Sequence, residues 1–508
     1  MAGPEIVGGS QSGKRAPADS TLLDAILGEE GKPQAASRAA RRGHFRTHSV
    51  CPRAPWPPQD NGGEGLLSYD FTVSVPASTI LVGDHAAVFG CPSVVLPIPL
   101  YLTAALRLVR AKGDTSQSQF KEVLDFWTVG PDADFDELVD SGHVWPNCLD
   151  GSSPKKNPFR HHKLRSVFDE FSHYLRRRPP DSSRPDWAGY ELVIRSQIPM
   201  GCGLGSSGAL SSALALLVEL ANSPTNHQLS NWDLSTLRQG QPSDSAMRVL
   251  NHAHRFESLM QGDSSSATGP FASLTGTDNG TPILFRAEGK RESVRNLVDA
   301  RGYPQKVGRL APTESAITQI EVKTLGIAGA NWLRELDLMD IYTRSQRGTA
   351  EVLKTNNLIA RWDESQPKMQ SMVDKFWENA LRGDFMDVMS AMEAYRSLEQ
   401  GYLKDFTPYD VENNRGDPAY LGARRLVGYF SAHGLASKYS GAGKGGDLIV
   451  LGRQTDFPDP ENVRSHFRIH FYTKWIRPAG KAAASRTGRT QWSALPRIFA
   501  KDGAGVGG

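Results

Sequence analysis

The chain has 508 residues, of which 39% are hydrophobic and 22% are charged, and its formal net charge is +3. These values are typical of a globular protein with more than one domain, and the balanced charge selects no particular partner. No run of eighteen apolar residues is present, which excludes an ordinary membrane-spanning helix. The N-terminus lacks the apolar segment of a secretory signal, and the four cysteines form no Cys-x-x-Cys pair. We therefore expect a cytoplasmic protein without structural zinc or disulfides.

The first 65 residues are expected to form a disordered extension. They are rich in Gly, Ala, Pro, Ser and Arg, and they show little hydrophobic periodicity. Such a composition is typical of segments that cannot bury enough apolar surface to fold.

The middle of the chain mixes strands and helices without regular alternation. Strands are predicted at LSYDFTVSV, SVVLPIPLYLTAALRLV and YELVIRSQI, which are rich in β-branched or alternating residues. Apolar spacing of three and four predicts helices over residues 206–221, near 160–175 inside an insertion at 110–185, and twice between 369 and 400. This irregular order predicts an α+β fold in two domains, residues 66–340 and 341–460.

The last segment, residues 461–508, is predicted to be a basic low-complexity tail. Residues 473–508 contain seven Lys or Arg and one Asp. Such a run of charges most often indicates a solvated tail. The alternative is a tail that contacts RNA or anionic lipid. Elsewhere no basic stripe with interleaved aromatic residues is visible, so we expect no nucleic-acid site in the core.

A glycine-rich loop, GCGLGSSG at residues 201–208, lies between a predicted strand and a predicted helix. The start of a helix offers unpaired N–H groups and a positive dipole end, while glycines allow a phosphate to approach the backbone closely. The loop lacks the Gly-Lys-Ser/Thr ending of a Walker motif. Gly203, Gly205 and Gly208 match the dinucleotide fingerprint, but Glu219, the acidic residue at about the right distance, still lies inside the helix. A glycine turn that only permits close helix packing is the remaining alternative.

Four segments together resemble the GHMP kinases, the superfamily of galactokinase, homoserine kinase and mevalonate kinase. PMGCGLGSSGA at 199–209 resembles the superfamily's phosphate loop. VSVPASTILVGDHAAVFGCPSVVLPIPL at 73–100 resembles the first motif of mevalonate kinases in particular. DIYTRSQRGTAEVL at 340–353 and KYSGAGKGGDLIVL at 438–451 resemble later motifs in the expected order. The resemblance extends from residue 66 to about 455, and the mevalonate kinases are the nearest group.

This resemblance implies a fold, two cofactors and a set of site residues. The fold would pair a ribosomal-protein-S5-like N-terminal domain with a ferredoxin-like C-terminal domain, and ATP and Mg²⁺ would bind between them. Ser207 and Glu257 would hold the metal, while Asp84 and His85 would lie near the phosphoryl acceptor, although His85 could equally be a core histidine. The nucleotide would contact two glycine motifs, namely Pro199, Gly201, Gly203, Leu204, Gly205, Ser206, Ser207, Gly208, Gly441, Ala442, Gly443, Gly445 and Gly446.

The sequence departs from the mevalonate kinase pattern at two catalytic positions. Ser78 stands where that pattern has a lysine, and Thr268 stands where ungapped alignment from Glu257 puts the catalytic aspartate. Asp263 in the same loop could replace the aspartate, or could lie in a solvated turn. Positioning and electrostatics carry most of the rate of phosphoryl transfer, so a slower enzyme can work without a general base.

Two functions therefore remain open from the sequence. The first is an ATP- and Mg²⁺-dependent kinase acting on mevalonate or a related small hydroxy compound, with a homodimer as one assembly seen among its relatives. The second is a pseudokinase that binds nucleotide as a regulatory module.

Overall fold

The computed structural model describes the central part of the chain with gaps. The described residues are 69–88, 90–110, 121–128, 161–176, 187–198, 203–222, 231–261, 265–277, 280–289, 317–325, 336–342, 362–402, 426–440, 447–457, 472–476 and 495–500. Backbone contacts divide the chain into Met1–His48 and Ser49–Gly508, and all described residues belong to the second unit. The extension predicted over residues 1–65 lies outside the described residues.

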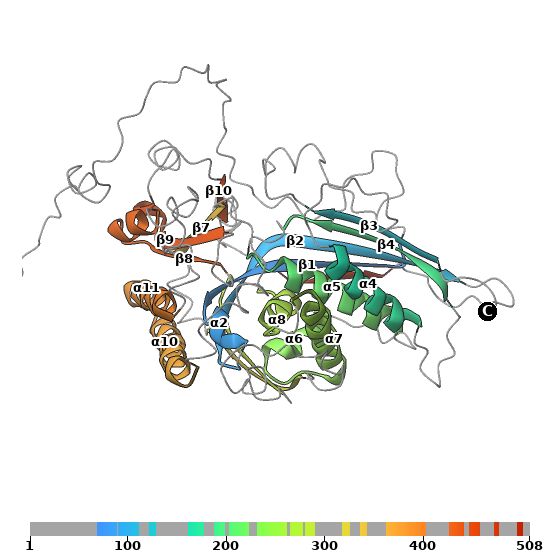
Figure 1. Cartoon of the computed structure of the whole chain (residues 1–508), viewed down its shortest axis with the longest axis horizontal. Helices are drawn as coiled ribbons and strands as arrows, with labels where there is room; N and C mark the ends of the chain where they lie inside the picture. Colours follow the sequence, from blue (N-terminus) through green and yellow to red (C-terminus); the bar gives the residue numbers. More distant parts are fainter. Residues whose placement is uncertain are drawn as a thin grey trace, which may run out of the picture. The chain divides into compact units, whose positions relative to one another are not determined.

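The larger sheet has seven strands. Four of them, β1 to β4, are labelled in Figure 1. The strands pair in the order β11-β1-β2-β4-β3, while β5 pairs with both β2 and β6. Only β3 and β4 run parallel among these pairs. The strands are β1 (Phe71–Val82), β2 (Ser93–Arg110), β3 (Lys121–Thr128), β4 (Trp187–Ser196), β5 (Ile283–Gly289), β6 (Ile317–Thr324) and β11 (Arg497–Ala500).

A layer of helices covers one face of this sheet (Figure 1). Helix α5 lies centrally and contacts β1, β2, α7 and α8, and its residues from Gly208 to Val218 are all buried. A helix that is apolar on every side is stable only when surrounded by protein, which explains its central place. The helices are α4 (His161–Arg176), α5 (Ser206–Asn222), α6 (Asn231–Arg238), α7 (Asp244–Gln261) and α8 (Thr268–Thr275).

The second sheet has four antiparallel strands in the order β10-β7-β9-β8. These are β7 (Leu336–Tyr342), β8 (Ala436–Tyr439), β9 (Asp447–Arg453), which continues into the short η4 (Gln454–Asp456), and β10 (Tyr472–Ile476). Helices α10 (Trp362–Arg382) and α11 (Phe385–Tyr402) pack against each other as a hairpin, and α11 contacts β8 of this sheet. The short helix α2 (Asp84–Ala87) follows β1 and contacts α10.

The structure confirms the α+β fold class and the main predicted elements. The helix predicted over 206–221 spans Ser206–Asn222, and the helix predicted near 160–175 spans His161–Arg176. The composition of residues 461–508 did not suggest β10 and β11, yet each of these strands pairs with a strand from earlier in the chain. Across the described residues, no helix is long and apolar enough to cross a membrane.

Candidate active site

The glycine loop enters helix α5 through left-handed backbone angles. Gly203 has φ 94° and Gly205 has φ 72°, and α5 begins directly afterwards at Ser206. Side chains other than glycine rarely adopt these angles, so the two glycines allow the tight approach to the helix start. The first N–H groups of an α-helix have no partner within the helix, and here they lie beside the loop. This geometry suits an anion such as a phosphate.

Strand β1 supports the loop from behind through Ser78. The Ser78 backbone N–H donates to the Leu204 carbonyl oxygen at 3.2 Å. A Cβ atom added to Gly205 would lie 2.5 Å from Ser78 Oγ, so the two residues touch. The Ser78 side chain is buried, and it therefore acts as part of the floor under the loop.

Glu257 on α7 lies beside the first turn of α5. Its Oε1 accepts hydrogen bonds from Ser207 Oγ at 3.1 Å and from Gln261 Nε2 at 3.2 Å, and its Oε2 accepts one from Ser265 Oγ. Burial raises the pKa of Glu257 from 4.5 to about 7, against the lowering effect of the hydrogen bonds from Ser265 and Ser207. The structure thus brings together the two residues predicted to hold the metal.

A carboxylate and a hydroxyl oxygen fit the ligand preference of Mg²⁺. Within the described residues no group of three or more His, Cys, Asp or Glu could hold a metal ion. A Mg²⁺ ion at Ser207 and Glu257 would therefore take its other ligands from water and phosphate oxygens, as Mg²⁺ commonly does at nucleotide sites.

Thr268 lies in a hydroxyl network at the start of α8. Its Oγ1 lies 3.1 Å from Ser93 Oγ and accepts a hydrogen bond from Ser266 Oγ at 3.0 Å. The preceding Ala267 has φ 61°, an uncommon angle for a residue with a side chain that costs about 1–3 kcal/mol and tends to occur at functional sites. Asp263, the alternative base, lies outside the described residues.

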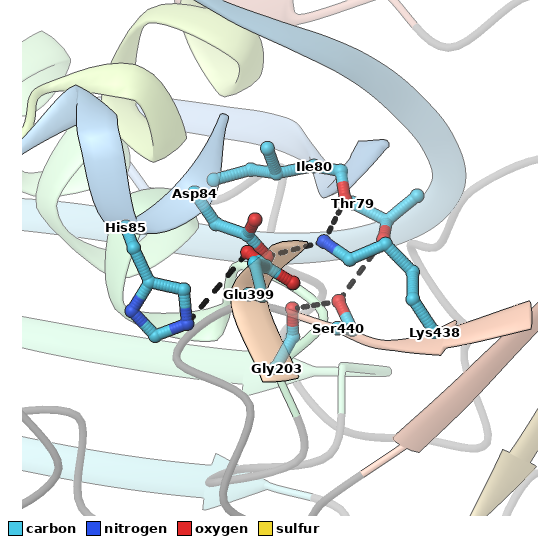
Figure 2. Close-up of polar contacts among 8 residues, drawn as sticks. All are labelled: Thr79, Ile80, Asp84, His85, Gly203, Glu399, Lys438 and Ser440. Atoms are coloured by element: carbon cyan, nitrogen blue, oxygen red, sulfur yellow. Dashed lines mark hydrogen bonds and ion pairs between the residues drawn. The ribbon is translucent and has the colours of Figure 1, made fainter. Parts of the chain in front are cut away.

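A buried group of ionisable side chains lies beside β1, and we call it the lysine cluster. It consists of Asp84 and His85 from α2, Tyr395 and Glu399 from α11, and Lys438 from β8. Lys438 Nζ forms an ion pair with Asp84 Oδ2 and donates to the Ile80 carbonyl oxygen at 3.2 Å (Figure 2).

Glu399 completes this cluster from the helical side. Its Oε1 lies 3.8 Å from His85 Nε2 (Figure 2). Burial, followed by the negative charge of Asp84, raises the pKa of Glu399 well above its ordinary value, although the charge of Lys438 opposes the shift. The cluster therefore holds an ion pair next to a carboxyl group that favours its neutral form.

Ser440 links β8 to both β1 and the glycine loop. Its hydroxyl donates to the Gly203 carbonyl oxygen at 2.6 Å and lies 3.0 Å from Thr79 Oγ1 (Figure 2). The loop, β1 and the start of the third glycine motif thus meet at one place. Some predicted site residues lie outside the described residues. These are the residues of the third glycine motif from 441 to 446, Pro199 and Gly201.

Sequence reasoning missed several residues of this site. Lys438 and Ser440 fall within the motif that starts the third glycine segment, so a signal for them was available. Gln261 follows Glu257 by four residues and therefore shares its helix face. Glu399 and Tyr395 gave no signal beyond helical periodicity.

The fold and the glycine loop define an α+β protein with a helix start whose geometry suits an anion. Residues 165–268 match the family model described as "GHMP kinases N terminal domain". The matched residues include the glycine loop, Ser207, Glu257 and Thr268. Residues 165–268 are therefore similar to the N-terminal domain of GHMP kinases, in agreement with the resemblance expected from the sequence motifs.

A curated relative and several solved structures extend the comparison. A mevalonate kinase of Candida albicans is 29% identical over 187 residues, which cover 33% of this chain and 42% of that protein. The Lin0012 protein of Listeria innocua has a similar fold, with a TM-score of 0.51 and 13% identity over 84% of this chain and 99% of that one. The mevalonate kinase of Methanococcus jannaschii gives a TM-score of 0.45 and 16% identity over 80% of this chain and 96% of that one.

Proposed function

We propose that this protein is an ATP- and Mg²⁺-dependent kinase that phosphorylates a hydroxyl group of a small molecule. The observation that supports the proposal most directly is the glycine loop at the start of α5, with the Ser207–Glu257 pair beside the first turn of that helix. A phosphate site next to a pair of oxygen ligands for Mg²⁺ is what a nucleotide triphosphate requires.

In this proposal the described residues act by position and by charge. The N–H groups at the start of α5 would hold phosphate oxygens, and Ser207 and Glu257 would hold the metal. A bound Mg²⁺ would neutralise charge on the phosphates. The acceptor hydroxyl oxygen forms a bond to the γ-phosphorus while the bond from that phosphorus to the bridging oxygen breaks. The electron pair leaves on ADP, and the hydroxyl proton passes to water.

The acceptor that we favour is mevalonate or a close relative of it. The first motif at residues 73–100 and the match to the Candida albicans mevalonate kinase support this choice. The structure of a Streptococcus pneumoniae phosphomevalonate kinase, 14% identical, has been solved with phosphomevalonate and AMPPNP. A phosphorylated acceptor is therefore included among the compounds to be tested. The cytoplasmic setting, the domain boundaries and the homodimer expected above remain parts of this proposal.

An ADP-release assay with a panel of acceptors tests the proposal. Mevalonate, phosphomevalonate, homoserine and sugars are supplied with Mg²⁺-ATP, and one of them is expected to raise ADP production. Glu257→Gln and Ser207→Ala should each weaken Mg²⁺-ATP binding, whereas Glu364→Gln, at an exposed ion pair of α10, should not. Absence of ATP binding by the wild-type protein would refute the proposal.

The second candidate is a pseudokinase that binds nucleotide without turnover. It is favoured by Ser78 and Thr268, which fill two catalytic positions with packed hydroxyl groups instead of ionisable ones. Tight ATP binding without acceptor-dependent ADP release would select this alternative. The double variant Ser78→Lys, Thr268→Asp then shows whether the scaffold still presents an acceptor, because turnover should appear if it does.

A further inference from the structure

Lys438 is the buried ammonium group of the lysine cluster. Its side chain is 1% exposed, and it is the one buried lysine among the residues that the structure describes. Lysine is almost never fully buried unless it is paired, because removing its charge from water is costly. A buried ion pair seldom stabilises a protein more than apolar side chains of similar volume would. The contribution of the ion pair to the stability of the protein therefore does not explain why a lysine is buried at this position.

Lys438 reaches the stretch of β1 that supports the glycine loop. Ser440, two residues after Lys438, donates to the Gly203 carbonyl oxygen. On β1, Lys438 Nζ contacts the Ile80 carbonyl oxygen, two residues after Ser78, which lies against Gly205. Figure 2 shows Lys438 and Ser440 reaching the same stretch of β1 from β8.

The chemistry of the loop needs a positive charge at this end of the site. Negative charge is spread over the oxygens of a phosphoryl group during its transfer, and fixed cations that stabilise it account for much of the rate. Ser78, on the β1 face under the loop, carries no charge. Lys438 approaches that same strand with an ammonium group, held by Asp84.

We propose that Lys438 supplies, from beneath β1, the fixed positive charge that stabilises the transferred phosphoryl group, in place of a lysine at position 78. This inference rests on the proposed kinase function. Lys438 neither gains nor loses a proton during the phosphoryl transfer. Its role is to supply a fixed positive charge. Asp84 holds the ammonium group in place before the substrates bind.

Replacement of Lys438 in the full-length protein tests this assignment. Lys438→Met removes the charge and keeps the approximate volume. We expect kcat to fall by about 10²–10³-fold, the loss typical when one group that stabilises transition-state charge is removed, while the Kd for Mg²⁺-ATP changes by less than about threefold. Lys368→Met, at a lysine that is 54% exposed, is the matched control and should leave kcat unchanged.

Two further variants separate catalysis from folding. Lys438→Met leaves Asp84 as an unpaired buried charge, which can unfold the protein. The double variant Asp84→Asn, Lys438→Met removes both charges, and its kcat should remain at least about tenfold below that of Asp84→Asn alone. Adding Ser78→Lys to Lys438→Met should restore kcat by at least about tenfold, which a purely structural lysine would not explain.

The outcomes also separate this inference from the proposed function. If the wild-type protein turns over an acceptor and Lys438→Met does so with similar kcat, the role of Lys438 is refuted and the kinase function stands. The role of Lys438 is refuted in the same way if Asp84→Asn and the double variant are equally active. If the wild-type protein binds no ATP, both proposals fall together.

Discussion

At the scale of single residues, the lysine cluster shows how a protein tolerates several ionisable groups away from water. Lys438 and Asp84 form a buried ion pair, and the raised pKa of Glu399 keeps a second full negative charge from adding to that of Asp84. Two carboxylates close together cannot both ionise without strong repulsion. The protonation of Glu399 is therefore linked to folding.

Glu399 is expected to make the protein less stable as the pH rises. The pKa of Glu399 in the folded protein is raised well above its ordinary value of 4.5. Its contribution to the free energy of unfolding is therefore fully present below pH 4.5 and is lost as the pH rises through the folded pKa. The groups that face it are Asp84 and His85 from α2, Lys438 from β8 and Tyr395 from its own helix. Melting temperatures of the wild type and Glu399→Gln between pH 5 and 9 test this.

The wild-type melting temperature should fall more steeply over this range than that of Glu399→Gln, whose amide does not titrate. Glu364→Gln, at a glutamate that is 49% exposed, should leave the slope as in the wild type. Parallel curves for the wild type and Glu399→Gln would contradict the assignment.

Gly205 offers a second test at this scale. Gly205→Ala places a side chain at φ 72°, which costs about 1–2 kcal/mol. It also brings Cβ within 2.5 Å of Ser78 Oγ. Gly434→Ala is a matched control, because Gly434 has φ 73° and nothing within 4 Å of the added Cβ.

Urea unfolding and ATP binding should separate the two alanine variants. Both variants should be destabilised by the left-handed backbone angle. Gly205→Ala should be destabilised by about 1–3 kcal/mol more, the usual cost of overpacking, and should bind ATP more weakly. Equal destabilisation would mean that the contact with Ser78 is unimportant.

At the scale of elements, α5 is positioned by close contact with α8. A Cβ atom added to Gly208 would lie 2.5 Å from the Gly269 carbonyl carbon, so the two backbones touch. Ser212 Oγ donates to the Pro270 carbonyl oxygen at 3.1 Å on the same side of the helix. This contact fixes the start of α5 against the end of the loop that contains Ser265 and Thr268.

Gly208→Ala should therefore destabilise the protein by about 1–3 kcal/mol, since backbone atoms cannot move aside as side chains can. Gly428→Ala is the control, because Gly428 also lies in a helix and an added Cβ would meet nothing within 4 Å. It should be neutral or stabilising by up to about 1 kcal/mol. Urea unfolding of both variants measures the difference, and an equal effect would refute the contact.

At the scale of the whole molecule, the sequence predicted local structure better than long-range pairing. The glycine loop and α5 followed from composition and periodicity, and the Ser207–Glu257 pair followed from the resemblance to the GHMP kinases. The contact between Lys438 and Asp84 joins residues 354 positions apart, and no local pattern reports such a pairing. The edge strand β11 was also missed, because four residues in a basic, Gly-rich segment carry little alternation.

Strand β11 should nevertheless contribute to stability. It pairs with β1 from Phe71↔Ala500 to Ser74↔Arg497, and its removal exposes the hydrogen-bonding groups of β1. A chain that ends at residue 496 should melt several degrees lower and aggregate more readily than one that ends at 500. The chain ending at 500 is the control and should match the full-length protein. Identical melting of both truncations would show that the pairing is unimportant.

The hydrogen bond from Ser440 to Gly203 has a consequence for how the protein is made. These residues are 237 positions apart, so at about 5–20 residues per second the ribosome delivers Ser440 roughly 10–50 s after Gly203. During that interval the nascent chain contains the glycine loop without its hydrogen-bond partner Ser440. A newborn polypeptide therefore completes this contact only after Ser440 has been made, and a message cut short before that codon yields a product that lacks it.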